Sequence, residues 1–175
     1  MMTIGVNFAF VTPSVATGDP AIQIGGGNLG HVFLSKISMS RKGGCLDMAS
    51  PYINATESLL IPELKHLDHR RINLKIFTGS KSNMEEGAKI VDGYPWKTRV
   101  LKNIKKLHAK MFLWRGRDGF NCALIGSQNL TRAGFYHNAE AGVLIGGHKK
   151  REVDDVLDCC AAHLQLLATG SHTQI

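Results

Sequence analysis

Apolar residues recur every three to four positions in three stretches of the chain, a spacing that aligns their side chains on one face of a helix. The first stretch follows Asn28, a residue type that commonly caps a helix N-terminus. Its apolar members are Leu29, Val32, Phe33 and Ile37. Similar patterns predict helices over residues 56–69 and 152–167, and a shorter helix is expected over residues 84–90.

Short runs rich in β-branched and aromatic residues lie between these stretches and predict strands. They read CLDMASPYI (45–53), INLKIFTG (72–79), TRVLKNI (98–104), LHAKMFLW (107–114), CALIG (122–126) and AEAGVLIG (139–146). Helices alternate with strands early in the chain and strands dominate its second half, which favours a layered α/β domain. We expect one domain over residues 1–175, in which residues 1–27 show no clear pattern beyond a short strand AIQI.

Composition is that of an ordinary globular protein, because 43% of the residues are hydrophobic and 20% are charged. Four scattered cysteines do not form the pattern of a disulfide framework and favour a reducing compartment. The apolar start has no Lys or Arg ahead of it, as a signal peptide requires, and no apolar run approaches a membrane span in length. We therefore expect a cytoplasmic protein with no membrane segment.

The net charge of +7 and the isoelectric point of about 9.4 favour a polyanionic partner. Lys and Arg release counterions from phosphates, so nucleic acid and anionic membrane surfaces both fit. Several basic residues flank the polar cluster described next, where a polynucleotide backbone would have to lie. They are Lys97, Arg99, Lys102, Lys105, Lys106, Arg132, Lys149, Lys150 and Arg151.

Polar residues interrupt the predicted strand LHAKMFLW at His108 and Lys110. Residues two apart in a strand point to the same face, so we expect these side chains to project together. An isolated pair of this kind is usually only a solvated face. Downstream, however, a strand ends directly before GSQN (126–129), a turn whose free N–H groups suit an oxyanion, and Glu140 begins the next strand.

The run HAK…IGSQNLT…NAEAGVLI resembles the single-motif branch of the phospholipase D superfamily, especially its nuclease and restriction-endonuclease members. More weakly, NLGHVFLSKI, CLDMASPYI and INLKIFTG resemble the elements that precede the motif in relatives. The resemblance implies an α/β/α sandwich with a mixed central sheet. It also implies a phosphodiesterase that needs neither a metal ion nor another cofactor.

The resemblance assigns a role to each matching residue. His108 would be the nucleophile and form a covalent phosphohistidine. Lys110 and Asn129 would hold the non-bridging phosphate oxygens, and Ser127 could add a donor. Glu140 would accept a hydrogen bond from the far nitrogen of His108 and fix its tautomer.

The same mechanism needs a second histidine to protonate the leaving oxygen. The sequence contains no second His-x-Lys motif, so the resemblance implies a homodimer whose subunits share one site. One position departs from the family's commonest signature, because Arg115 stands where relatives carry an aspartate five positions after the lysine. Asp118 lies nearby in a predicted turn. The departure disfavours lipid-cleaving enzymes more than it disfavours activity.

Other motifs give weaker signals. Gly25, Gly27 and Gly30 satisfy G-x-G-x-x-G, but a dinucleotide site needs a clear preceding strand, and a plain loop before a helix is favoured. Two His- and Cys-containing stretches, HLDHRR with His66 and His69, and CCAAH with Cys159, Cys160 and His163, lack a second ligand pair at zinc spacing. Aromatic residues near the motif are few, namely Trp96, Trp114, Phe120, Phe135 and Tyr136.

The leading hypothesis is therefore a metal-independent nuclease, acting on DNA rather than RNA, with His108, Lys110, Asn129, Glu140 and Ser127 in its site. One alternative is a lipid phosphodiesterase or phosphatidyl transferase. The other is a nucleic-acid-binding module that keeps the fold without catalysis.

Overall fold

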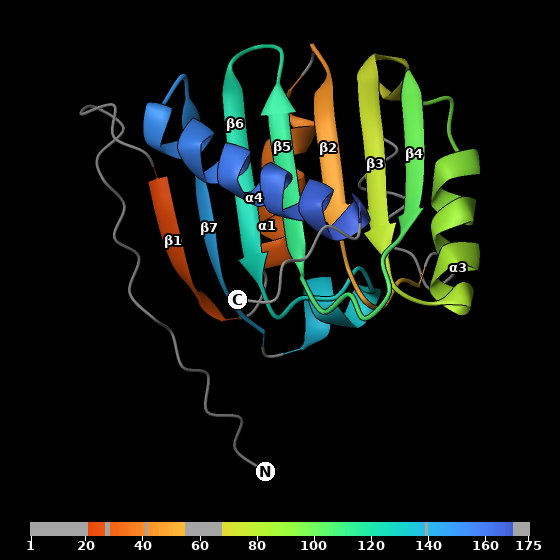
Figure 1. The fold of residues 1–175 in the computed structure, drawn as a ribbon. Coiled ribbons are helices and arrows are strands. Elements are labelled where there is room, and N and C mark those ends of the chain that lie inside the picture. The colour runs from red at the N-terminus through yellow and green to blue at the C-terminus, as the bar shows by residue number, and fades with distance from the viewer. Residues whose placement is uncertain (1–20, 27–28, 41, 55–67, 139, 170–175) are drawn as a thin grey trace.

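A computed structural model describes residues 21–26, 29–40, 42–54, 68–138 and 140–169. Seven strands form one sheet in the order β1-β7-β6-β5-β2-β3-β4, with helices on both faces (Figure 1). The strands are β1 (Ala21–Gly26), β2 (Gly44–Ala49), β3 (Ile72–Thr78), β4 (Thr98–Asn103), β5 (Met111–Gly116), β6 (Phe120–Gly126) and β7 (Ala141–His148). The helices are α1 (Leu29–Ser38), α3 (Lys81–Asp92) and α4 (Arg151–Thr169), with short turns of helix at His69–Arg71 and Ala133–His137.

The sheet is mixed. Strands β2, β3 and β4 run parallel to one another, whereas β5 is antiparallel to both β2 and β6. Strand β7 is antiparallel to β6, and β1 adds an antiparallel edge strand to β7. Because helices cover both faces, the expected α/β/α sandwich with a mixed central sheet is confirmed.

Alternation along the strands divides the buried residues into two cores. On β2, Leu46 and Met48 face the side covered by α1, while Cys45 and Asp47 face the side that α4 crosses. The core on the α1 side also contains the fully buried Trp114. The core under α4 is smaller, and that helix crosses the sheet obliquely (Figure 1).

Several predicted elements are confirmed, including the helix after Asn28, the closing helix and the short strand AIQI. The helix expected over residues 56–69 and the Asn28 cap lie almost wholly outside the described residues. The helix expected over residues 84–90 is longer, because α3 begins at Lys81. Ser80 caps α3 by accepting a hydrogen bond from the Asn83 backbone N–H at 3.3 Å, a signal that the polar stretch concealed.

The glycine-rich stretch before α1 is structural. Gly25 and Gly26 lie within β1 rather than in a loop after it. Gly30 lies in α1, where a Cβ atom would approach the Phe135 ring to 2.5 Å. This glycine therefore permits close packing between α1 and the 133–137 turn.

Candidate active site

One edge of the sheet gathers the residues expected to form the site. Strands β2, β3 and β6 end at this edge and β5 and β7 begin there, at the bottom of the view in Figure 1. We call it the lower edge; it consists of the segments that follow Ala49, Thr78 and Gly126 and those that precede Met111 and Ala141. Segments from four separate parts of the chain thus meet there.

His108 and Lys110 lie just ahead of β5 rather than within it, so the predicted strand LHAKMFLW was too long at its start. The Lys110 carbonyl oxygen still accepts a hydrogen bond from the Gly126 N–H at 3.2 Å, which extends the β5–β6 pairing by one residue. The His108 side chain is exposed. The Lys110 ammonium folds back and donates to the His108 carbonyl oxygen at 3.2 Å.

A tight turn delays the start of β5. The Leu107 N–H donates to the Ile104 carbonyl oxygen at 3.1 Å, and Ile104 is itself anchored by its N–H to the Thr78 carbonyl oxygen at 2.7 Å. Lys106 adopts a φ of 58°, a conformation that glycine favours at this place in a turn. No glycine or asparagine marks the turn in the sequence, so the strand pattern hid it.

Glu140 and Ser127 are brought together at the same edge. The Ser127 hydroxyl donates to the Glu140 carboxylate and accepts from the Ala141 N–H at 3.0 Å. The other carboxylate oxygen of Glu140 accepts from the Asn138 side-chain amide at 3.0 Å. Glu140 is buried, and both its oxygens are occupied by partners other than His108.

The expected hydrogen bond between His108 and Glu140 is therefore not formed among the described residues. The imidazole of His108 makes no hydrogen bond with any described residue. The structure unites Ser127 with Glu140 and leaves the His108 ring open to solvent.

Asn129 is the third residue after β6, in the turn that Ser127 begins. Its side-chain Oδ1 is buried and has no hydrogen-bond partner among the described residues. The neighbouring Gln128 is fully buried, and its side chain occupies the space left by two glycines: a Cβ atom on Gly126 would lie 2.3 Å from its Oε1, and one on Gly142 would lie 3.0 Å from its Nε2. The missing side chains thus allow the turn to fold against the sheet.

A second loop supports the Asn129 turn from the end of β2. The Ser50 hydroxyl accepts from the Leu130 N–H at 2.9 Å and donates to the Tyr52 carbonyl oxygen at 2.6 Å. Ile53 and Leu130 form an isolated parallel bridge, and the Asn54 N–H donates to the Leu130 carbonyl oxygen at 3.1 Å. Residues 50–54, which we call the β2 loop, are therefore fastened to the turn that presents Asn129.

Asn83 of α3 holds the β2 loop from the other side. Its side-chain amide donates to the Pro51 carbonyl oxygen at 2.7 Å, and its Oδ1 accepts from the Ile53 N–H at 2.9 Å. The sequence offered one signal for Asn83, its spacing of three residues from the capping Ser80. It offered none for Ser50, because the predicted strand CLDMASPYI ran on to residue 53 whereas β2 ends at Ala49.

The basic residues expected to line a groove are divided between two edges. Lys105 and Lys106 are exposed in the turn ahead of His108, and Arg132 follows the Asn129 turn, all at the lower edge. The stretch at residues 149–151 follows β7 at the opposite edge, and Lys97 precedes β4 there. Only part of the predicted basic surface can therefore reach a substrate at the lower edge.

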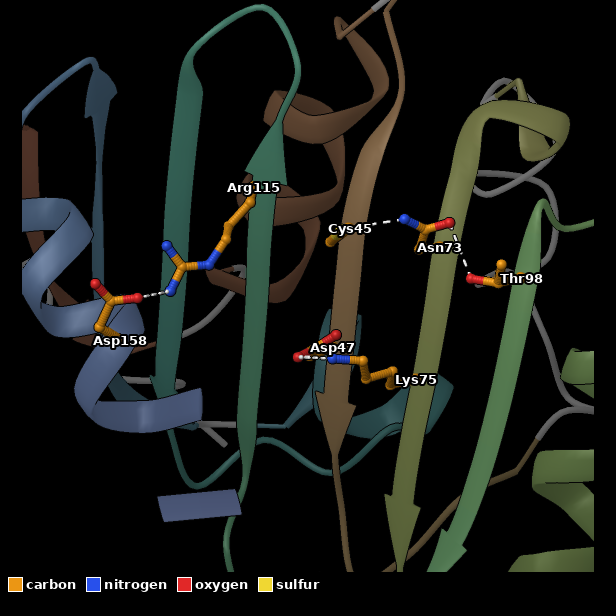
Figure 2. Close-up of polar contacts among 7 residues, drawn as sticks. All are labelled: Cys45, Asp47, Asn73, Lys75, Thr98, Arg115 and Asp158. Atoms are coloured by element: carbon orange, nitrogen blue, oxygen red, sulfur yellow. Dashed lines mark hydrogen bonds and ion pairs between the residues drawn. The ribbon is translucent and has the colours of Figure 1, made fainter. Parts of the chain in front are cut away.

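Arg115, at the position where relatives carry aspartate, forms an ion pair with Asp158 of α4 at 2.7 Å (Figure 2). Asp118 does not replace the missing aspartate, because it lies in the β5–β6 turn at the opposite edge. There it accepts from the Ser40 hydroxyl at 2.8 Å and from the Phe120 N–H at 3.0 Å. Arg115 thus joins β5 to α4 and lies away from the lower edge.

Asp47 lies on the same sheet face as Arg115, beside Lys75 at 3.6 Å (Figure 2). Burial raises the pKa of the Asp47 carboxyl, and the positive charges of Lys75 and Arg115 oppose that rise. Its Oδ1 is buried without a hydrogen-bond partner among the described residues. Neighbouring charges and hydrogen bonds thus offset the burial of the Asp47 carboxylate only in part.

The residues weighed as metal ligands have other surroundings. The His69 ring stacks on Tyr94 with centroids 4.2 Å apart and meets the edge of Trp96 at 4.5 Å. Cys160 packs against the core under α4. Within the described ranges, no three or more His, Cys, Asp or Glu side chains gather as metal ligands would, and His66 lies outside those ranges.

Comparisons with known proteins agree with this architecture. A family model described as "Cardiolipin synthase, PLD-like domain" matches residues 34–158. The fold is similar to that of Nuc from Salmonella typhimurium, a phospholipase D family member, with a TM-score of 0.56 and 18% identity over 85% of this chain and 94% of that one. NucT from Helicobacter pylori is similar with a TM-score of 0.56 and 16% identity over the same shares.

TrmBL2, an archaeal chromatin protein with a novel mode of DNA binding, is similar over 89% of this chain and 53% of its own, with 15% identity and a TM-score of 0.50. No curated protein sequence matches this chain significantly. Within the described residues, no helix has both the length and the apolar character needed to cross a bilayer.

Proposed function

Since the chain belongs to the family of phospholipase D-like domains, we propose that it is a phosphodiesterase that cleaves nucleic acid with His108 as its nucleophile. The observation that carries the proposal is the meeting of His108, Lys110, Asn129 and Glu140 at one edge of the sheet, from the starts of β5 and β7 and the end of β6. Nothing in the packing of the fold requires an exposed histidine and a half-buried lysine and amide at the same place.

The proposed reaction has two displacements. In the first, a neutral imidazole nitrogen of His108 forms a bond to phosphorus, and the bond from phosphorus to the leaving oxygen breaks while an acid supplies that oxygen with a proton. In the second, water attacks phosphorus and loses a proton to the same group, and the nitrogen recovers its electron pair. Lys110 and the Asn129 amide stabilise the charge on the non-bridging oxygens, so this chemistry needs no metal ion.

Ser127 and Glu140 serve this site as a pair. Their hydrogen bond and the contact with Asn138 hold the turn that presents Asn129. For Glu140 to orient the His108 ring as relatives imply, it must exchange one of these two partners for the imidazole. We therefore propose that Glu140 positions the Asn129 turn in the free protein and engages His108 when substrate arrives.

Nucleic acid is the substrate class that the charge supports best. The chain has a net charge of +7, and Lys105, Lys106 and Arg132 lie beside the site. TrmBL2 is a DNA-binding protein with a similar fold, which supports DNA as the polyanion.

The acid for the first step is proposed to be His108 of a second copy, so that two chains share one site. Mixing native and His108→Ala protein in equal amounts tests this after subunit exchange. If the site is shared, the mixture retains about a quarter of the activity of the same total amount of native protein, because about a quarter of the dimers contain two native chains. If each chain has its own site, the mixture retains about half. In the second outcome the acid lies within one chain, and exposed His137, next to Asn138, is the first residue to replace.

The main experiment measures cleavage of plasmid and single-stranded DNA in excess EDTA by native, His108→Ala and His148→Ala proteins. His148 is a matched control, because it is also exposed but lies at the opposite edge of the sheet. Cleavage that persists in EDTA, survives in the control and vanishes in His108→Ala supports the proposal. Equal cleavage by native and His108→Ala proteins refutes it.

A second candidate is phosphatidyl transfer, which the cardiolipin synthase description of the matching family model favours. Incubation with vesicles of anionic phospholipid, followed by analysis of the lipid products, distinguishes it from nuclease activity. DNA binding that falls with salt and survives His108→Ala, with no turnover of either substrate by native protein, would instead identify a binding module.

A further inference from the structure

An exposed aromatic ring lies at the lower edge. Tyr52 in the β2 loop is 61% exposed, and of the Phe, Tyr and Trp residues in the described part of the chain it alone is exposed rather than buried or half-buried. The other aromatic residues near the motif do not offer their rings in this way, since Trp96, Trp114 and Phe135 are buried and Phe120 and Tyr136 are half-buried. Exposure of one tyrosine is ordinary in itself, so its position decides what it can do.

The register of the chain sets Tyr52 beside Asn129. Ile53 and Leu130 are paired in a parallel bridge, and both side chains are buried. The residues that precede such a pair are neighbours as well, and extended chains alternate the direction of their side chains. Tyr52 and Asn129 each directly precede one residue of this pair, and the exposed Tyr52 side chain faces away from the core that holds Ile53.

Hydrogen bonds fix the backbone around Tyr52. The preceding carbonyl, of Pro51, and the following N–H, of Ile53, are both held by the Asn83 side chain. The Tyr52 carbonyl oxygen accepts from the Ser50 hydroxyl, which also accepts from the Leu130 N–H. The ring is thus presented from a rigid loop, which reduces the entropy lost when a ligand packs against it.

We infer that Tyr52 stacks on a base of the substrate next to the phosphate held by Asn129, and that the preferred substrate is unpaired nucleic acid. The inference rests on the proposed function. A base within a duplex has both faces covered by its neighbours, whereas an unpaired base offers a face to an aromatic ring. The exposed Lys105 and Lys106 at the same edge neutralise backbone phosphates without reading sequence.

The test compares two single-stranded oligonucleotides of equal length, one with natural bases and one with abasic spacers. KM and kcat are measured for native, Tyr52→Leu and Tyr52→Phe proteins, with Met39→Ala as a control. Met39 is 79% exposed at the opposite edge, so its replacement also alters an exposed apolar side chain. These substitutions leave the fold intact, because Tyr52 is held through its backbone.

Loss of one stacked base raises KM for the natural oligonucleotide by roughly five- to a hundredfold in Tyr52→Leu. We expect kcat to stay near native, the abasic substrate to be unaffected, and Tyr52→Phe and Met39→Ala to behave as native protein. An equal effect on both substrates overturns the inference. So does a change of oligomeric mass in Tyr52→Leu without a change in KM, which would identify the ring as a subunit contact.

A binding measurement separates this inference from the proposed function. In a His108→Ala background, Tyr52→Trp introduces an exposed indole, while native Trp96 and Trp114 are buried. Quenching of the added emission by the natural oligonucleotide, but not by the abasic one, supports stacking even if native protein cleaves nothing. Absence of quenching overturns the inference even if cleavage depends on His108.

Discussion

Asn83 should contribute far more to the free energy of unfolding than its position in a polar helix suggests. It is buried, and its side chain satisfies the Pro51 carbonyl and the Ile53 N–H, neither of which has another hydrogen bond among the described residues. Asn83→Ala leaves both groups unpaired, and each unsatisfied buried group costs about 1–3 kcal/mol. The summed loss is about 2–6 kcal/mol, which lowers Tm by roughly 4–24 °C in a chain of this size.

The assay is thermal unfolding followed by circular dichroism, combined with hydrogen exchange of the peptide that contains the β2 loop. Asn73→Ala is the matched control, because Asn73 is half-buried on β3 and contacts the exposed Thr98 hydroxyl and the Cys45 thiol (Figure 2). We expect the control to change Tm by no more than about 2–4 °C. We also expect the Ile53 amide to exchange faster only in Asn83→Ala.

Equal changes in Tm for the two variants would refute this reasoning. So would unchanged exchange at Ile53 in Asn83→Ala, because the amide would then owe its protection to something other than the Asn83 side chain.

Lys106→Gly should stabilise the protein by about 0.5–1 kcal/mol, because glycine tolerates a φ of 58°; an unchanged or lower Tm would contradict the strain inferred there. Gln128→Met removes two buried polar atoms that have no hydrogen-bond partner among the described residues. Its free energy of unfolding in urea should lie within about 1 kcal/mol of the native value or above it, and a large loss would reveal a buried partner. Asp47→Asn should stabilise the protein above the raised folded-state pKa of this carboxyl. Wild-type stability falls as pH rises from the ordinary value of 3.8 through that raised pKa, so a Tm advantage that is absent below pH 3.8 and complete at neutral pH is expected.

Much of the architecture could be predicted because periodicity reports burial. The helix that buries Phe33 and Ile37 and the strand that buries Leu74 and Ile76 each show the spacing of their structure. The resemblance of the HAK and IGSQNLT segments led to the family, which the match over residues 34–158 establishes. Hydrophobic periodicity shows which face of a helix or strand is buried, and a sequence motif shows the order of the site residues along the chain.

Neither signal describes polar contacts between distant segments. The chain gives no local sign that Ser50 supports the Asn129 turn, since the Ser50 hydroxyl and the Leu130 N–H that it binds lie 80 positions apart in the sequence. The partners of Asn83 likewise lie in a distant segment, the β2 loop. The start of β5 was misplaced because a lysine occupies a turn position where glycine is expected.

The β5–β6 turn lies at the opposite edge from the proposed site, and Gly119 turns the chain there with a φ of +88°. A chain divided at this turn yields one fragment with His108 and Lys110 and another with Asn129 and Glu140. Neither fragment holds a complete set, and the two reunite by pairing β5 with β6 and β1 with β7. The protein could therefore serve as a split reporter, in which the activity recovered after mixing the two fragments would measure how many molecules have reassembled.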